Sequence, residues 1–148
     1  MDLKEGQKAS RSMQVTAEHV EMFAQMTGDR NPLHFDEAFA AGTKFGRLVA
    51  QGGITTGLLH ALVAMDLPGP GTVFLNQEWQ FTAPVYIGDT ITAEVEVLKV
   101  HASKPVTQLG VRISQQEGET VLEGEAWCYT FSPAAAWQAS DGRQVNDD

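Results

Sequence analysis

The feature that most constrains the fold of this chain is a change of hydrophobic period near residue 71. Residues 54–65, with the sequence ITTGLLHALVAM, are apolar almost all round, which predicts a buried helix rather than an amphipathic surface helix. The run LPGPG at residues 67–71 ends that helix, because proline and glycine interrupt regular structure. Beyond it, apolar and polar residues alternate, which is the period of β-strands.

Four alternating runs predict four strands, each with one apolar face. These faces are Val73, Leu75, Gln77, Trp79 and Phe81; Ile91, Ala93, Val95 and Val97; Leu109, Val111 and Ile113; and Val121, Trp127, Tyr129 and Phe131. Turn residues at 87–89, 103–105 and 117–119 separate the runs, and such short connections predict an antiparallel meander. A further short strand is expected near residues 13–15.

If a helix is apolar on all sides and is followed by long antiparallel strands, its surface is best buried by a sheet that curls around it. The sequence therefore predicts an α+β fold. Such a sheet leaves an edge strand with unpaired backbone N–H and C=O groups, and two copies that pair edge to edge satisfy these groups. A homodimer is the expected unit.

Length and charge exclude several classes of protein. At 148 residues the chain is long enough for one domain, which we assign to residues 1–131, followed by a polar tail at residues 132–148. The net charge of −9 and the lack of a basic stripe argue against binding to nucleic acid or to an anionic membrane. The longest apolar run, residues 48–67, is interrupted by polar residues and glycines, so we expect no membrane span.

The single cysteine, Cys128, lies in a strand-like run and is expected to be a small buried hydrophobic residue rather than a nucleophile. One cysteine permits no internal disulfide, and the charged N-terminus does not resemble a signal peptide. A cytoplasmic location is therefore expected. The four histidines show no metal-ligand spacing, so no metal site is expected.

The main candidate for chemistry is the stretch TGDRNPLH at residues 27–34. Thr16 is the expected N-cap of a helix over residues 17–26 before this stretch, and Asp36 the expected N-cap of a short helix over residues 37–41 after it. Gly28 and Pro32 favour a tight loop that turns Asp29 and His34 toward a common point. An Asp–His pair can act as acid and base, but the same residues also form ordinary surface turns.

The order of residues from Phe23 to Ala40 favours an acid–base role for Asp29 and His34, because it resembles the hydratase signature of the MaoC-like, (R)-specific enoyl-CoA hydratases. That signature contains an aromatic residue, an aliphatic residue, a small residue, Gly-Asp-x-Asn-Pro, an aliphatic residue and His, with a small residue six positions on, here Ala40. Met26 stands at the aliphatic position. The run YIGDT at residues 86–90 resembles a second family turn, in which we expect Asp89 to be structural, and the resemblance covers about residues 5–131.

The resemblance implies a hot-dog fold, an antiparallel β-sheet curled around a long buried central helix, assembled as a homodimer or a dimer of dimers. It also implies reversible syn addition of water to a trans-2-enoyl thioester, with no cofactor beyond the coenzyme A of the substrate. Asp29 is then the expected base, and His34 positions the water and relays its proton. Gly52 or Gly53 would offer a backbone N–H to the thioester oxygen, or serve tight packing, and Asn31 would brace the loop.

One departure from the family concerns the acyl group. Gln51 stands where many relatives have histidine, and His60 stands where small or apolar residues are commoner. Together with Thr56, His60 would line the acyl site and suit a branched, oxygenated or carboxylated chain, although a hydrogen-bonded core histidine is the simpler interpretation.

Two other functions remain open, an acyl-CoA thioesterase and a non-catalytic subunit that binds an acyl thioester. The carrier, coenzyme A or acyl carrier protein, is not defined. An anionic carrier needs local positive charge, for which Arg30, Lys44 and Arg47 are candidates, unless these three are only solvated surface charges.

Overall fold

The computed structural model describes residues 2–132 and contains four helices and five strands within them. In chain order these elements are β1 (Lys8–Gln14), α1 (Ala17–Thr27), α2 (Pro32–Phe35), α3 (Glu37–Ala41), α4 (Gly52–Met65), β2 (Thr72–Phe81), β3 (Thr90–Val100), β4 (Val106–Gln115) and β5 (Thr120–Thr130). Residues 133–148, and with them nearly all of the predicted tail, lie outside the described residues. The division into one domain and a tail stays a prediction.

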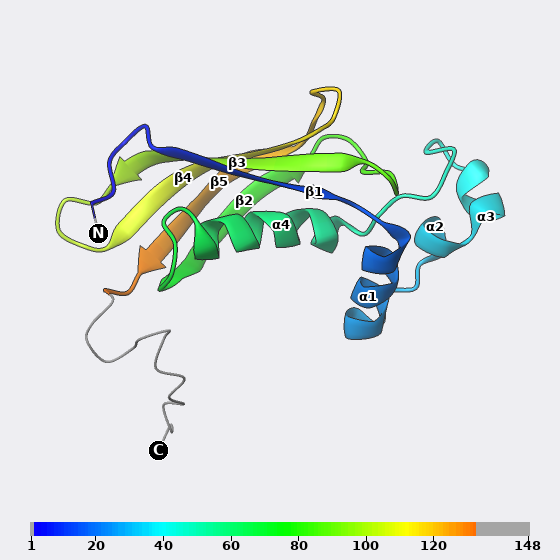
Figure 1. The fold of residues 1–148 in the computed structure, drawn as a ribbon, viewed down its shortest axis with the longest axis horizontal. Helices are drawn as coiled ribbons and strands as arrows, with labels where there is room; N and C mark the ends of the chain where they lie inside the picture. The colour runs from blue at the N-terminus through cyan, green and yellow to red at the C-terminus, as the bar shows by residue number, and fades with distance from the viewer. Residues whose placement is uncertain (1, 133–148) are drawn as a thin grey trace, which may run out of the picture.

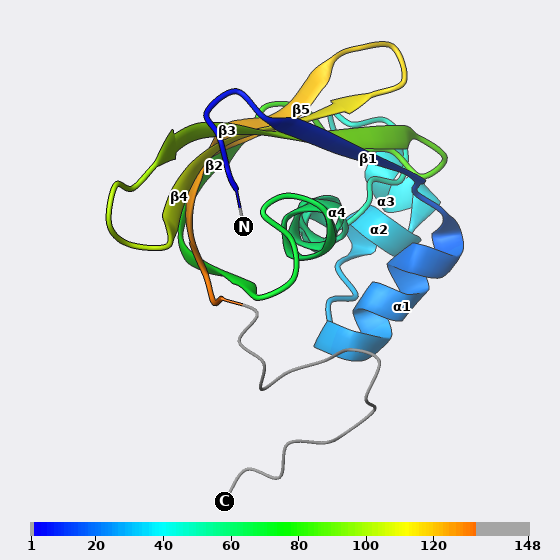
Figure 2. The same ribbon diagram turned by 60° about the vertical axis from the view of Figure 1, so that its left-hand side comes forward.

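The five strands form one antiparallel sheet in the order β1-β3-β4-β5-β2, and the sheet curls around α4 (Figures 1 and 2). The sheet side of α4 carries the core residues Leu59 and Leu62, both with no exposed surface. They belong to the same hydrophobic cluster as Ile91 of β3 and Leu109 of β4. The predicted helix enclosed by an antiparallel sheet is therefore confirmed.

The prediction that α4 is buried on all sides is wrong for this chain alone. Gly57 and His60 are exposed, and Met65 keeps 59% of its surface. Five strands curl around one side of the helix and leave the other side open (Figure 2). The apolar residues of this open side led to the wrong prediction, because they are not covered by the rest of the same chain.

Strand β1 is longer than predicted, because it begins at Lys8 rather than near residue 13. It is an edge strand that pairs only with β3, and most of its side chains are exposed. Ala9 and Met13 pack against the core, but the exposed Arg11 lies between them, so the first half of the strand shows no run of apolar alternation.

In β2 the predicted apolar face is wrong at its start. The pairing register with β5 shifts between Phe74 and Asn76, and a β-bulge of this kind reverses the side to which the following residues point. Phe74 and Trp79 consequently pack against the core, whereas Val73 and Leu75 are 47% and 57% exposed.

In β5 the predicted apolar face is wrong in its second half. Ala126 and Cys128 point inward with no exposed surface, whereas Phe131 is 58% exposed. Cys128 is therefore buried as predicted, and this burial raises the pKa of its thiol to about 12. Such a thiol stays protonated near neutral pH and is a poor nucleophile.

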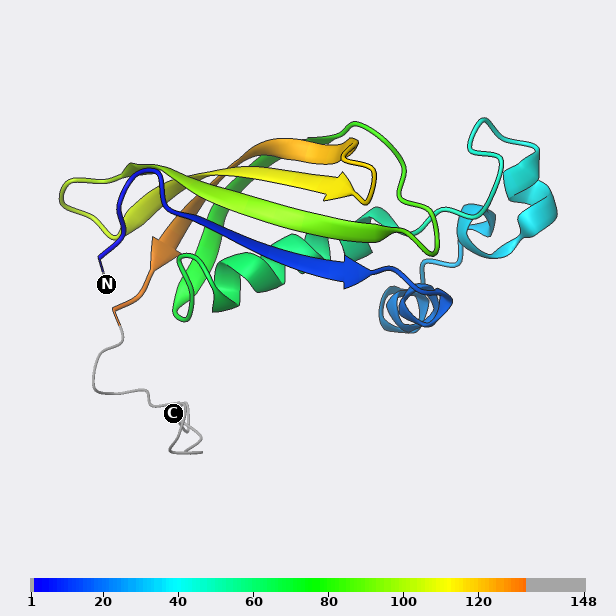
Figure 3. The same cartoon turned by 45° about the horizontal axis from the view of Figure 1, so that its top comes forward.

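Helices α1, α2 and α3 gather at one end of the sheet, beside the N-terminal end of α4 (Figures 1 and 3). The predicted caps are confirmed: the Thr16 hydroxyl accepts from the His19 N–H, and Asp36 Oδ1 accepts from the Phe39 N–H. Within the described residues, no helix has the length and apolar character to cross a membrane.

Candidate active site

The loop between α1 and α2 holds its shape through short-range hydrogen bonds. Gly28 ends α1 with a φ of 84°, a left-handed conformation that glycine adopts without strain. The Asp29 N–H then donates to the Thr27 hydroxyl at 3.1 Å, and Asp29 Oδ1 accepts from the Asn31 N–H at 3.2 Å. Asp29 therefore leaves the helix in a defined direction.

Asn31 and Pro32 start the next helix instead of continuing the loop. Asn31 Oδ1 accepts from the Leu33 N–H at 3.0 Å, and Pro32 occupies the first helical turn, where its missing N–H is not needed. This one-turn helix, which the sequence pattern did not predict, carries His34. The amide of Asn31 is thus engaged with the backbone.

Asp29 and His34 converge as predicted. The His34 Nε2 atom lies 3.8 Å from Asp29 Oδ2. The His34 side chain is only 10% exposed, and the Asp29 side chain is 39% exposed. The pair therefore opens to solvent on the Asp29 side, while the imidazole is held inside.

Val49, which was not predicted as a site residue, holds the histidine in place. His34 Nδ1 lies 2.7 Å from the carbonyl oxygen of Val49. Because a carbonyl only accepts hydrogen bonds, Nδ1 carries the proton, and in the neutral ring Nε2 is the acceptor that faces Asp29. Val49 is itself held by an antiparallel bridge to Tyr86.

The separation of 3.8 Å between Nε2 and Oδ2 is longer than a direct hydrogen bond. Two acceptors at this spacing suit a molecule that donates one hydrogen to each of them, and water is the smallest such molecule. The geometry can therefore orient a water by both of its protons.

The start of α4 lies three positions after Val49 in the chain. Gln51 is 1% exposed and donates from Nε2 to the Val20 carbonyl at 3.0 Å, which ties α4 to α1, and it makes no side-chain hydrogen bond to the first turn of α4. The N–H groups of Gly52 and Gly53 thus lack a side-chain cap from Gln51.

Both glycines serve close packing. A Cβ on Gly53 would collide with the ring of Phe23 in α1, and a Cβ on Gly52 would lie 3.1 Å from the ring of Phe81. The packing interpretation of these glycines is therefore supported.

Thr56 and His60 lie on the next turns of α4. The Thr56 hydroxyl donates back to the carbonyls of Gly52 and Gly53, both at 3.3 Å. His60 Nε2 accepts from Gln77 Nε2 at 3.2 Å, and its ring packs against Phe74 at a centroid distance of 4.7 Å. Partial burial lowers the pKa of His60, so the ring is neutral near pH 7. His60 is a surface histidine over an aromatic cluster and not a core residue.

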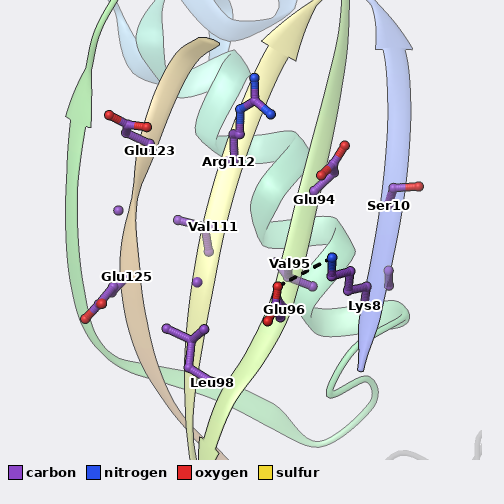
Figure 4. Close-up of a pocket in the computed structure, with 13 residues that line it drawn as sticks. Lys8, Ser10, Glu94, Val95, Glu96, Leu98, Val111, Arg112, Glu123 and Glu125 are labelled. Atoms are coloured by element: carbon purple, nitrogen blue, oxygen red, sulfur yellow. Dashed lines mark ion pairs between the residues drawn. The ribbon is translucent and has the colours of Figure 1, made fainter. Parts of the chain in front are cut away.

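A hollow of about 760 Å³ on the outer face of the sheet lies away from these groups (Figure 4). Its rim carries Glu94, Glu96, Glu123 and Glu125, against which Lys8 and Arg112 are the cations. It lies across the sheet from α4, and its charged lining residues are mostly acidic, so it is no extension of the Asp29–His34 site. Among residues 2–132 no group of three or more His, Cys, Asp or Glu side chains is placed to hold a metal ion.

Comparison with known proteins places this geometry in context. Residues 2–119 match the family model described as MaoC like domain. The chain is 43% identical to the (R)-specific enoyl-CoA hydratase of Aeromonas caviae over 124 residues, which are 84% of this chain and 92% of that protein. It is 41% identical to the 3-hydroxybutyryl-CoA dehydratase of Methylorubrum extorquens over 125 residues, 84% of this chain and 79% of the relative.

Solved structures agree. The (R)-hydratase from A. caviae, described as involved in PHA biosynthesis, superposes with a TM-score of 0.83 and 41% identity, over 87% of this chain and 98% of that one. The R-hydratase PhaJ1 from Pseudomonas aeruginosa superposes with a TM-score of 0.81 and 39% identity, over 86% and 82% of the two chains. The predicted hot-dog fold is confirmed.

Proposed function

This chain belongs to the MaoC-like domain family, and from that premise we propose that it is an (R)-specific enoyl-CoA hydratase, equally a 3-hydroxyacyl-CoA dehydratase. The observation that carries the proposal is the approach of His34 Nε2 to within 3.8 Å of Asp29 Oδ2, with His34 Nδ1 engaged by the Val49 carbonyl. Two acceptors then face one water, which is the arrangement that hydration of a double bond requires.

The reaction proceeds by addition of this water across C2 and C3 of a trans-2-enoyl thioester. The water oxygen forms a bond to C3 while one of its protons passes to Asp29, and the π electrons move toward the thioester oxygen. A proton from the Asp29–His34 pair then reaches C2, which restores the pair. Because both groups act on the same face, hydroxyl and hydrogen arrive on the same side of the former double bond.

The thioester oxygen gains negative charge in this step. The N–H groups of Gly52 and Gly53 at the positive end of the α4 dipole are the donors we assign to it. Loss of one such donor costs about 3 kcal/mol of transition-state stabilisation.

The acyl chain, in this proposal, follows α4 from Gly52 past Thr56 toward His60. His60 lies eight positions after Gly52 in the helix, which corresponds to about 12 Å. A chain of this length ends at the neutral His60–Gln77 pair. This polar end favours an acyl group that stops before it or one with an oxygen that can accept or donate a hydrogen bond.

A thioesterase fits less well, because α4 carries no carboxylate and its C-cap residue Asp66 is engaged by Arg11 at 3.0 Å. Incubation with crotonyl-CoA separates the three functions. We expect the enoyl absorbance to fall without release of free thiol. Release of thiol would identify a thioesterase, and no change in either signal across enoyl-CoAs of different chain length would identify a binding subunit.

We also propose that the chain is a homodimer formed through β2. This edge strand exposes Val73, Leu75 and Phe81 by 47%, 57% and 56%, whereas the opposite edge, β1, is polar. Light scattering should therefore give twice the chain mass of 16.1 kDa, and a monomer at micromolar concentration would contradict the proposal. The cytoplasmic location is likewise a proposal, which rests on the single reduced cysteine.

A further inference from the structure

Three cations lie close to the catalytic loop in sequence, and the structure separates them into two groups. Arg30 is engaged: its guanidinium donates to both oxygens of Glu21, at 3.2 and 2.7 Å. This pairing lowers the pKa of Glu21, mainly through the hydrogen bonds, and ties the loop to α1. Arg30 therefore stabilises the loop, and its guanidinium is occupied by Glu21 rather than available to a ligand.

Arg47 and Lys44 are in a different situation. Both side chains are exposed, and within the described part of the chain neither lies within 4.0 Å of a carboxylate oxygen. The segment that contains them, residues 42–50, has no acidic residue. In a chain with a net charge of −9, such a segment is a local region of positive charge.

The Arg47 guanidinium stacks on a fixed aromatic ring. Its Cζ atom lies 3.9 Å from the centroid of the Tyr86 ring. Tyr86 is held at both ends, because its hydroxyl donates to the Phe45 carbonyl at 2.9 Å and its N–H donates to Asp89 Oδ2 at 2.9 Å. Stacking fixes the plane of the guanidinium and leaves its N–H groups free at the rim, which is the geometry that binds phosphate with two hydrogen bonds.

This platform is connected to the candidate active site by a short stretch of backbone. Arg47 precedes Val49 by two residues, so their Cα atoms are at most about 7 Å apart. Val49 holds His34 through its carbonyl and Tyr86 through its bridge. The Arg47–Tyr86 platform and the hydrogen-bond partner of His34 therefore lie on the same short stretch of backbone.

We infer that Arg47 binds the phosphate at the end of the pantetheine arm of the thioester substrate, with Lys44, three residues before it, as the second cation of the same segment. This inference rests on the proposed hydratase function and adds the site at which the carrier is held. A phosphate is attached to pantetheine both in coenzyme A and on acyl carrier protein, so the same platform serves either carrier.

The test compares three thioesters of the same crotonyl group: crotonyl-CoA, crotonyl-phosphopantetheine and crotonyl-pantetheine, which lacks phosphate. In Arg47→Gln and in Lys44→Ala we expect kcat/KM for the two phosphate-bearing substrates to fall about tenfold, mainly through KM. For crotonyl-pantetheine the same variants should stay within twofold of the wild type. Lys104→Ala, which removes a cation from the β3–β4 connection at the far end of the sheet, is the matched control and should change none of the three.

The outcomes separate this inference from the proposed function. Wild-type protein that hydrates none of the three thioesters, and no enoyl-CoA of greater chain length, contradicts the proposed function. Wild-type protein that hydrates them, with variants that lose activity equally on all three or on none, overturns the phosphate site. A loss confined to crotonyl-CoA also overturns it, because the site would then recognise the nucleotide part. Activity on crotonyl-pantetheine reports at the same time that each variant is folded.

Discussion

Asp29→Asn is expected to lower kcat for hydration of crotonyl-CoA by about 10²–10⁴-fold, the usual contribution of a positioned acid or base. The substitution keeps the side-chain size and the oxygen that accepts from the Asn31 N–H, so the loop should keep its conformation. In the proposed mechanism, it removes the carboxylate that takes the proton from water. His34→Ala should have an effect of similar size, because it removes the second acceptor for the same water.

The variant that combines Asp29→Asn with His34→Ala tests whether the two groups act together. Two groups that act on one water form a unit, so the combined loss in kcat should be close to the larger single loss and far from the product of the two. Asp36→Asn is the matched control, since Asp36 is the next carboxylate along the chain and only caps α3. It should keep kcat within about twofold. A rate near that of the wild type in Asp29→Asn would remove Asp29 from the mechanism.

The convergence of Asp29 and His34 could be predicted because the signals are local. Gly28 needs a left-handed backbone, Pro32 sets the start of a helix, and the intervening residues are bonded to one another within five positions. The helix starts at Thr16 and Asp36 were predicted for the same reason, since a cap is read from neighbouring residues.

The features that the sequence did not reveal depend on contacts between distant segments. The Val49 carbonyl that orients His34 has no side-chain signature, and it is separated from the histidine by fifteen residues. The stack of Arg47 on Tyr86 joins two loops that are brought together by contacts such as the bridge between Val49 and Tyr86. Proximity in sequence placed Arg30 in the same group as Arg47, although the structure commits Arg30 to Glu21.

The errors in the strand faces have a similar cause. A β-bulge in β2 changed the inward face after Phe74, and β5 presents small residues toward α4 where aromatic residues were expected. Alternation in the sequence gives the period of a strand, but curvature of the sheet decides which side chains fit beneath it. The effect of sheet curvature on side-chain space is clearest at Gly124 of β5, which pairs with Trp79 of β2.

Gly124→Ala is expected to destabilise the protein by about 3 kcal/mol, at the upper end of the range for overpacking. A Cβ at this position would collide with the carbonyl oxygen of Glu78 and would lie 2.5 Å from the Cα of Trp79. Both are backbone atoms of β2, so no change of rotamer relieves the contact, and the two strands must separate. Urea denaturation at fixed protein concentration measures the free energy of unfolding.

Gly57→Ala is the matched control for this prediction, because the same methyl group is added where no atom lies within 4 Å. Gly57 is in the interior of α4, where alanine is favoured over glycine by up to about 1 kcal/mol, so this variant should be more stable than the wild type. Opposite signs in the two variants would show that the cost at Gly124 comes from the close approach of β2 and β5. Equal unfolding midpoints for Gly124→Ala and the wild type would mean that the sheet does not curl this tightly around α4.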